Sequence, residues 1–263
     1  MKVGSPKQTG AFTLTELLVV VVTIGLLVAA IVPAYSTAKA KSDRIWCINF
    51  QKQMGTAFRV FASDNGDRYP LQTKTNAYIV PTGATATQVN SAAAEPWQIA
   101  QCLWNELQTP RVLLCLSDRE RTPFKRVEDF NGFAGKTGSV TTASLAHPAN
   151  QNNAVSYAFA VAADESRPIG VLIVDRNVNN VGLAGAGVAT NVALTRSRVF
   201  LNATPGPTQA VWVKGTPIHD LQGNVTFADG SVQQATAEVL RQSFENAAKS
   251  YGTITNQNEM LFP

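Results

Sequence analysis

An apolar stretch near the amino terminus constrains this chain more than any other feature. Every residue from Leu17 to Val32 is apolar except Thr23 and the small Gly25. With its flanks the stretch reaches the roughly 20 residues that a helix needs to cross a bilayer. It is too uniform for an amphipathic surface helix. The sequence therefore predicts a membrane segment, and an acid, Glu16, stands at its front edge.

A cleaved secretory signal is one interpretation of this stretch. Lys2 and Lys7 precede it, and residues 38–40 (AKA) offer a small-x-small cleavage site. Glu16 argues against this interpretation, because an acid within a membrane helix costs up to about 2.5–3.5 kcal/mol at its centre, and less near the interface. Lys and Arg number two before the stretch and three after it. Charge therefore does not fix the orientation.

Overall composition is that of an ordinary globular protein. The 263 residues, 45% hydrophobic and 15% charged, suffice for one sizeable domain or two small ones. The formal net charge is +4, and the sequence contains no run rich in Lys and Arg. Since nucleic-acid binding normally shows a basic stripe or a known motif, we expect no nucleic-acid partner.

Residues 11–20 (AFTLTELLVV) resemble the processing site of type IV prepilins and type II secretion pseudopilins. The resemblance implies that residues 1–11 are a leader, which a prepilin peptidase removes on the cytoplasmic side before methylating Phe12. The family usually has Gly before the Phe, whereas here Ala11 stands there and Gly10 comes one step earlier. We favour cleavage between Ala11 and Phe12 over cleavage after Gly10, because it makes Glu16 the fifth mature residue, as in the family.

The same resemblance gives Glu16 and Pro33 roles. Glu16 of one subunit would neutralise the amino terminus at Phe12 of its neighbour, since an unpaired buried charge is costly. The simpler alternative leaves Glu16 in the headgroup layer. Pro33 matches a helix-disrupting proline of type IV pilins, and proline favours a kink or a locally melted turn. A helix stop at the membrane exit is the simpler interpretation of Pro33, and the two interpretations are compatible.

The helical pattern continues beyond Pro33. An apolar stripe recurs at helical spacing and ends before Asn65-Gly66, a good stop signal. The stripe comprises Cys47, Phe50, Met54, Phe58 and Phe61. We therefore predict one helix over residues 12–64, with membrane or filament core at about 14–35, and an exported globular domain over residues 65–263. This is the lollipop architecture of pilins.

A second resemblance links two distant segments. Residues 44–55 (RIWCINFQKQMG) and 65–70 (NGDRYP), followed by His219, nine residues and Asp229-Gly230, look like a large pseudopilin-like group. Asp229-Gly230 is a strong signal for a two-residue hairpin turn, and Asp tolerates the left-handed conformation of such turns. We favour structural roles for His219, Asp229 and Gly230 over binding or catalysis, because no nucleophile motif accompanies them.

The rest of the chain predicts an α+β domain, with an antiparallel sheet packed on the second half of the long helix. Loops are expected over residues 72–95, 117–144 (with a short helix) and 177–195, and helices over 97–107 and 237–249, the latter capped by Thr236. Strands are expected over residues 111–116, 155–161, 170–174, 211–213, 224–228 and 231–234. The tail from Ser250 is polar and ends in Met-Leu-Phe-Pro.

Three cysteines leave one unpaired if a single bridge forms. The exported domain would face an oxidising compartment. Cys47 lies on the packing stripe and Cys115 in an expected core strand, so we prefer a Cys47–Cys115 bridge. Cys102–Cys115 is the second choice, and three buried free thiols also fit the sequence.

Acidic side chains offer a weak signal for calcium. Asp164, Glu165 and Asp175 fall near strand ends and could supply oxygen ligands. The sequence has no Asp-x-Asp-x-Asp-Gly loop, so a solvated acidic edge is the preferred interpretation and no cofactor is expected.

These features predict a structural subunit of a type IV pilus or a type II secretion pseudopilus. Its partners would be other pilin-like subunits, the prepilin peptidase and the inner-membrane assembly platform. It would sit in the bacterial inner membrane with a cytoplasmic leader and a periplasmic domain, and later in a periplasmic or cell-surface filament. A minor subunit or adhesin-like binding module is the alternative. We do not expect this protein to be an enzyme, because the exported region shows no nucleophile–base pair, no set of metal ligands and no phosphate-binding loop.

Overall fold

The computed structural model describes residues 12–72, 79–82, 85–88, 94–132, 138–181, 198–200, 209–213, 218–219, 221–251 and 258–263. Contacts divide the chain into two units, residues 1–42 and 43–263. The helices are α1 (Leu14–Asp64), α2 (Pro96–Cys102), α3 (Trp104–Leu107) and α4 (Ala237–Tyr251), with 3₁₀ turns η1 (Pro70–Gln72), η2 (Pro110–Leu113), η3 (Thr122–Arg126) and η4 (Gln151–Ala154). The strands are β1 (Ile79–Thr82), β2 (Thr85–Gln88), β3 (Tyr157–Ala160), β4 (Val171–Asp175), β5 (Val178–Val181), β6 (Arg198–Phe200), β7 (Gln209–Trp212), β8 (Gly223–Phe227), β9 (Val232–Ala235) and β10 (Glu259–Leu261).

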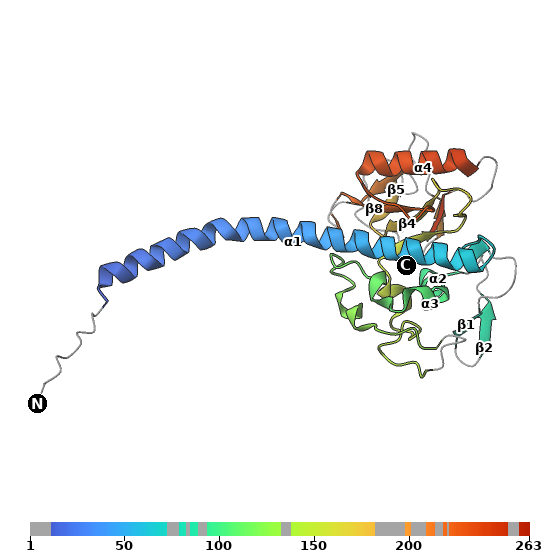
Figure 1. Ribbon diagram of the computed structural model, residues 1–263, viewed down its shortest axis with the longest axis horizontal. Coiled ribbons are helices and arrows are strands. Elements are labelled where there is room, and N and C mark those ends of the chain that lie inside the picture. The colour runs from blue at the N-terminus through green and yellow to red at the C-terminus, as the bar shows by residue number, and fades with distance from the viewer. Residues whose placement is uncertain are drawn as a thin grey trace, which may run out of the picture. The chain divides into compact units, whose positions relative to one another are not determined.

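The long helix α1 is labelled in Figure 1. Its start is fixed by a reciprocal pair of hydrogen-bonded residues, Thr13 and Glu16. The backbone N–H and the Oγ1 hydroxyl of Thr13 donate to Oε2 of Glu16, at 2.9 and 2.8 Å. The N–H of Glu16 donates to Oγ1 of Thr13 at 3.3 Å. This is a capping box, which satisfies N–H groups that have no partner within the helix.

The stretch from Leu14 to Val32 is long and apolar enough to cross a membrane, and none of it is buried. Its large side chains, such as Leu14 and Leu26, are exposed. α1 continues through Pro33, so the proline does not end the helix. The interpretation of Pro33 as a helix stop at the membrane exit is therefore wrong, whereas a kink there stays a prediction.

The expected stop signal ends α1. The N–H groups of Asn65 and Asp67 both donate to the carbonyl of Ala62, at 2.9 and 2.8 Å. Gly66 adopts a φ of +65°, which a residue without Cβ reaches at no steric cost. The helix thus ends at Asp64, as predicted.

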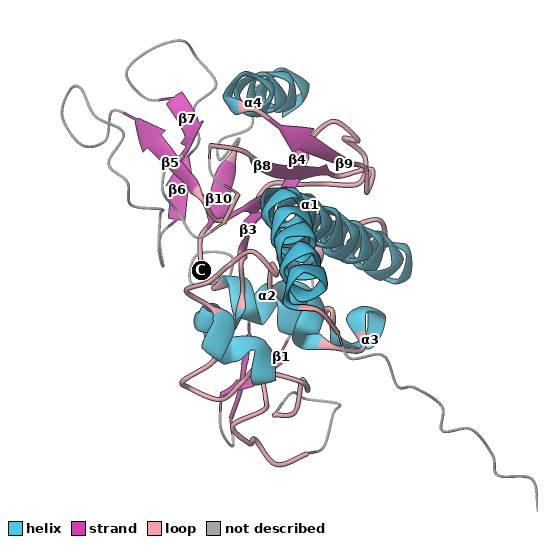
Figure 2. Cartoon of the chain, turned by 90° about the vertical axis from the view of Figure 1, so that its left-hand side faces the viewer, coloured by secondary structure: helices cyan, strands magenta, loops and turns pink. Residues whose placement is uncertain are grey.

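The globular unit is built on a six-stranded antiparallel sheet in the order β6-β10-β3-β4-β8-β9. The part of α1 from residue 43 to 64 and helix α2 lie on one side of it and α4 on the other (Figure 2). Strand β3 shows the alternation that this layering needs, since Tyr157 and Phe159 join the core under α1 and Ala158 joins the core under α4. Two separate pairs, β1-β2 and β5-β7, complete the described strands.

Two apolar cores stabilise these layers. The core on the α1 side contains Cys47, Met54, Phe58 and Phe61, which are the predicted stripe apart from Phe50, a partly buried residue packed against it. The core on the α4 side centres on Leu240 and Phe244. Because the stripe is buried here, the compact unit begins at Asp43 rather than at residue 65.

Several element predictions are wrong. The strand expected over residues 111–116 is instead η2 followed by extended chain, because Pro110 opens a 3₁₀ turn that Thr109 caps. The helix expected over 97–107 is divided into α2 and α3. The loop expected over 72–95 contains β1 and β2, and the one over 177–195 begins with β5. The tail forms β10, which lies buried between β6 and β3.

The Asp229-Gly230 turn is longer than the predicted two residues. Strand β8 ends at Phe227 and β9 begins at Val232. The N–H of Gly230 donates to the carbonyl of Phe227 at 2.9 Å, and Gly230 alone in this turn has a positive φ, +79°. Asp229 instead accepts the N–H of Ser231 on Oδ1 at 2.8 Å, so it stabilises the turn without being left-handed.

Candidate functional site: the helix seam

One side of α1 carries four residues at a spacing of four, Cys47, Gln51, Gly55 and Arg59. Residues four apart share a helix face. Gln51, Gly55 and Arg59 contact β8 and the turn that follows it, and the disulfide of Cys47 lies against His219, which precedes β8. We call these four residues, together with residues 218–219 and 221–230, the helix seam. The two motif segments that the sequence resemblance linked therefore lie side by side in the globular unit.

A disulfide closes the first end of the helix seam. Cys47 of α1 is bonded to Cys115, which follows η2, with 5.3 Å between their Cα atoms. This is the pairing preferred from the sequence, and Cys102 is a buried free thiol. The loop after Cys115 is held by Asp118, whose carboxylate is paired with the guanidinium of Arg176 at 2.8 Å.

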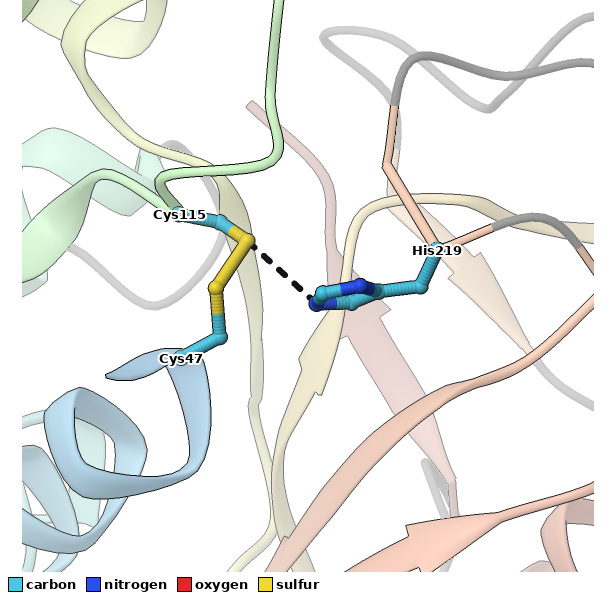
Figure 3. A group of neighbouring side chains, drawn as sticks. All are labelled: Cys47, Cys115 and His219. Carbon is cyan, nitrogen blue, oxygen red and sulfur yellow. Dashed lines mark hydrogen bonds between the residues drawn. A yellow bond between two sulfur atoms is a disulfide. The ribbon is translucent and has the colours of Figure 1, made fainter. Parts of the chain in front are cut away.

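His219 lies against this disulfide (Figure 3). Its Nε2 is 3.4 Å from Sγ of Cys115. Burial, reinforced by the nearby positive charge of Arg44, lowers the pKa of His219 to about 4, so the ring is neutral near pH 7. The residue has a φ of +22°, and its carbonyl accepts a hydrogen bond from Nδ2 of Asn177 at 3.1 Å.

A buried amide occupies the middle of the helix seam. Nε2 of Gln51 donates to Oδ1 of Asp175 on β4 at 2.7 Å, and its Oε1 accepts from the hydroxyl of Thr226 on β8 at 2.8 Å. The N–H of Asn224 donates to Oδ2 of Asp175 at 2.7 Å. One side chain of α1 thus satisfies polar groups on two central strands. Burial nevertheless raises the pKa of Asp175 to about 7.

Two glycines meet at the far end of the helix seam. A Cβ atom on Gly55 would lie 3.2 Å from Cα of Gly230 and 3.1 Å from Cγ2 of Thr226. The backbone of α1 can therefore approach the hairpin turn only because position 55 has no side chain. Arg59 adds a hydrogen bond from Nη1 to the carbonyl of Asp229 at 3.3 Å. The expected structural roles of Asp229 and Gly230 fit this packing.

The remaining predicted site residues include the processing site and the three acids considered for calcium. Ala11 falls outside the described residues, and Phe12 is 78% exposed just before α1. The three acids considered for calcium do not form one site, since Asp175 is bonded within the core while Glu165 pairs with Arg59 at 3.2 Å. Asp164 accepts the N–H of Ser166.

Sequence reasoning missed four features of the structure, one at the start of α1 and three in the globular unit. The capping box could have been found, since Thr-x-x-Glu at residues 13–16 is its signature. The Gly55–Gly230 approach and the Gln51–Asp175 contact join residues far apart in the chain, so only the fold brings them together. The structure also gathers a metal-competent set, Cys47, Cys115 and His219, where the sequence showed none.

Comparison with known proteins adds no assignment. No family model, no curated protein and no solved structure matches this chain.

Proposed function

We propose that this protein is a structural subunit of a type IV pilus or a type II secretion pseudopilus. In this proposal the prepilin peptidase cuts before Phe12 and methylates the new amino terminus. The subunit waits in the inner membrane with residues 43–263 in the periplasm. The assembly platform then extracts it into a filament of pilin-like subunits, whose core is formed by the apolar half of α1.

One observation carries the proposal. The helix segment from Leu14 to Val32 is apolar enough to span a membrane and is exposed, and its first turn carries a carboxylate, Glu16. Exposed apolar area of this extent marks a surface that contacts lipid or protein. A helix that leaves lipid for a bundle of identical helices remains in apolar surroundings, so the same surface suits both states.

The capping box sharpens the role proposed for Glu16. Both bonds from Thr13 end on Oε2, and Oε1 accepts neither of them. Glu16 can therefore cap its own helix and still present an oxygen to the amine at Phe12 of a neighbouring subunit. Such a pair would be strongly favoured in a filament core, where an isolated charge is costly.

The helix seam supports a firm attachment of the globular unit to the second half of α1. A filament subunit has to transmit force between its helix and its globular unit. In the helix seam that connection consists of a disulfide, buried hydrogen bonds to two central strands and a close glycine contact. We infer that these contacts keep the domain on α1 during extraction.

Three variants distinguish the two roles of Glu16, which are to cap α1 and to supply a negative charge for assembly. Glu16→Gln keeps a side chain that completes a capping box but removes the charge. Thr13→Ala removes the cap partner and keeps the charge. Glu16→Ala removes both contributions of Glu16. Each would be expressed with the prepilin peptidase and a pilus assembly machine, and subunits would be counted in sheared filaments and in the membrane fraction.

The proposal expects Glu16→Gln and Glu16→Ala to be lost from filaments while staying in the membrane, and Thr13→Ala to assemble. Normal assembly of Glu16→Gln would show that the carboxylate acts only as a cap. An absence of wild-type protein from filaments would remove the basis of the proposal.

A further inference from the structure

Three side chains of metal-binding type converge at the disulfide end of the helix seam. The sulfur atoms of Cys47 and Cys115 and a ring nitrogen of His219 all lie within 4.8 Å of one another. They come from α1, from the chain after η2 and from the turn before β8, so the fold brings them together from three distant segments. All three residues are buried, and the exposed fraction of His219 is 8%.

The imidazole of His219 is poorly matched to a disulfide. Its Nε2 lies 3.4 Å from Sγ of Cys115, and sulfur is only a weak hydrogen-bond partner. Burying an imidazole nitrogen without a good partner costs free energy, and an apolar side chain would fill the same space without that cost. Figure 3 shows the ring edge directed at the sulfur pair. An imidazole nitrogen and two sulfur atoms in this arrangement are donors of the kinds that zinc sites use.

We propose that, once the Cys47–Cys115 bond is reduced, the two thiolates and Nε2 of His219 bind one Zn²⁺ ion. An external dithiol or phosphine supplies the two electrons, the S–S bond breaks, and the two sulfurs take up two protons. Zn²⁺ then displaces these protons to solvent as it binds. A water molecule completes four ligands, as in zinc sites with three protein ligands.

The spacing of the donor atoms fits this ion. Zn–S bonds of about 2.3 Å and Zn–N bonds of about 2.0–2.1 Å place S and N about 3.6 Å apart at tetrahedral angles. The observed distance from Sγ of Cys115 to Nε2 of His219 is 3.4 Å. Two thiolates on one Zn²⁺ lie about 3.8 Å apart, a separation that the sulfurs can reach by side-chain rotation once their bond is broken.

Charge also favours this cation. Two thiolates and one Zn²⁺ sum to zero, so the occupied site places no net charge in a buried region. The S–S bond and a bound Zn²⁺ ion would each link α1 covalently or by coordination to the chain after η2. This inference concerns the globular unit and holds whether or not the protein assembles into a filament.

The test uses the full-length chain in detergent with Cys102→Ala, which removes the buried free thiol. The protein is reduced anaerobically with a phosphine, incubated with Zn²⁺ and freed of excess metal by gel filtration. Zinc per chain is measured by elemental analysis, alongside accessible thiols and near-UV circular dichroism. Matched samples are the oxidised protein and Cys102→Ala with His219→Gln.

We expect one Zn²⁺ per reduced chain, protection of both thiols, no zinc on the oxidised chain, and loss of stoichiometric binding in the His219→Gln variant. Absence of zinc from the reduced protein would overturn the inference, as would equal binding without the imidazole. If reduction alone weakens the near-UV signal, Zn²⁺ must restore it. Failure to restore that signal would also overturn the inference.

Discussion

At Asp175, burial and hydrogen bonding act on one carboxyl group in opposite directions. Bonds from Asn224 and Gln51 favour the charged form, but burial outweighs them and raises the pKa from 3.8 to about 7. The buried Oδ1 of Asn224 has no hydrogen-bond partner among the described residues, and a flip of that amide would let Oδ1 accept a hydrogen bond from protonated Oδ2 of Asp175. The helix seam thus suits the neutral acid.

The pKa of Asp175 predicts a loss of stability as pH rises. Below about pH 4 the folded and unfolded chains both hold the proton. Between pH 4 and 7 the unfolded chain has released it and the folded chain has not, so the free energy of unfolding falls by up to about 1.4 kcal/mol per pH unit. Above pH 7 the penalty is constant.

Comparison with Asp175→Asn isolates this effect, because other titrating groups cancel. Urea unfolding of both oxidised proteins at pH 5 and pH 7.5 should show the wild type losing stability relative to the variant. A difference between the two proteins that is equal at both pH values would refute the assignment.

Arg176 offers a second comparison at the scale of single residues. It pairs with Asp118, which is fully buried, and with Glu120, whose side chain is 62% exposed, at 2.8 and 2.5 Å. Removing the charge of a buried partner leaves the opposite charge buried and uncompensated, which is costly. Exposed ion pairs contribute little to the free energy of unfolding. Asp118→Asn should lower the free energy of unfolding by about 3–5 kcal/mol. Glu120→Gln should change it by at most about 1 kcal/mol. Equal effects in denaturant unfolding would contradict the burial argument.

At the scale of elements, the contact of α1 with the β8–β9 turn depends on Gly55. Ala is favoured over Gly in a helix by about 1 kcal/mol, so Gly55→Ala would stabilise an unpacked helix. Here the added methyl meets the backbone of Gly230 at 3.2 Å, and overpacking costs about 1–3 kcal/mol. We therefore expect net destabilisation, larger for Gly55→Val. Thr56→Ala, at an exposed neighbouring position, is the control. A stabilised Gly55→Ala protein in thermal unfolding would refute the close contact.

Elements with a strong local signal were predictable from the sequence. α1 has a long apolar stripe and a Gly stop, β8 and β9 flank a Gly turn, and α4 follows a Thr cap whose Oγ1 accepts the N–H of Val239. Elements decided by distant partners were not. The strand β10 forms because β3 and β6 offer edges to it, and η2 replaces a strand because Pro110 and Thr109 set a turn inside an apolar run.

At the scale of the whole molecule, the candidate site was predictable in its parts and not in its arrangement. The Cys47–Cys115 pairing followed from two apolar segments that both had to be buried. That His219 would meet this pair, while Gly230 meets Gly55 two helical turns further on, depends on the course of β8 beside α1. No local pattern encodes that course.

The amino terminus of the mature protein tests the central claim, that the chain is processed and assembled as a prepilin. Intact and peptide mass spectrometry of the protein from its native membrane would identify the first residue and its modification. The account predicts a chain that begins with methylated Phe12. A chain that keeps Met1, or one that begins beyond Ala40, would contradict it.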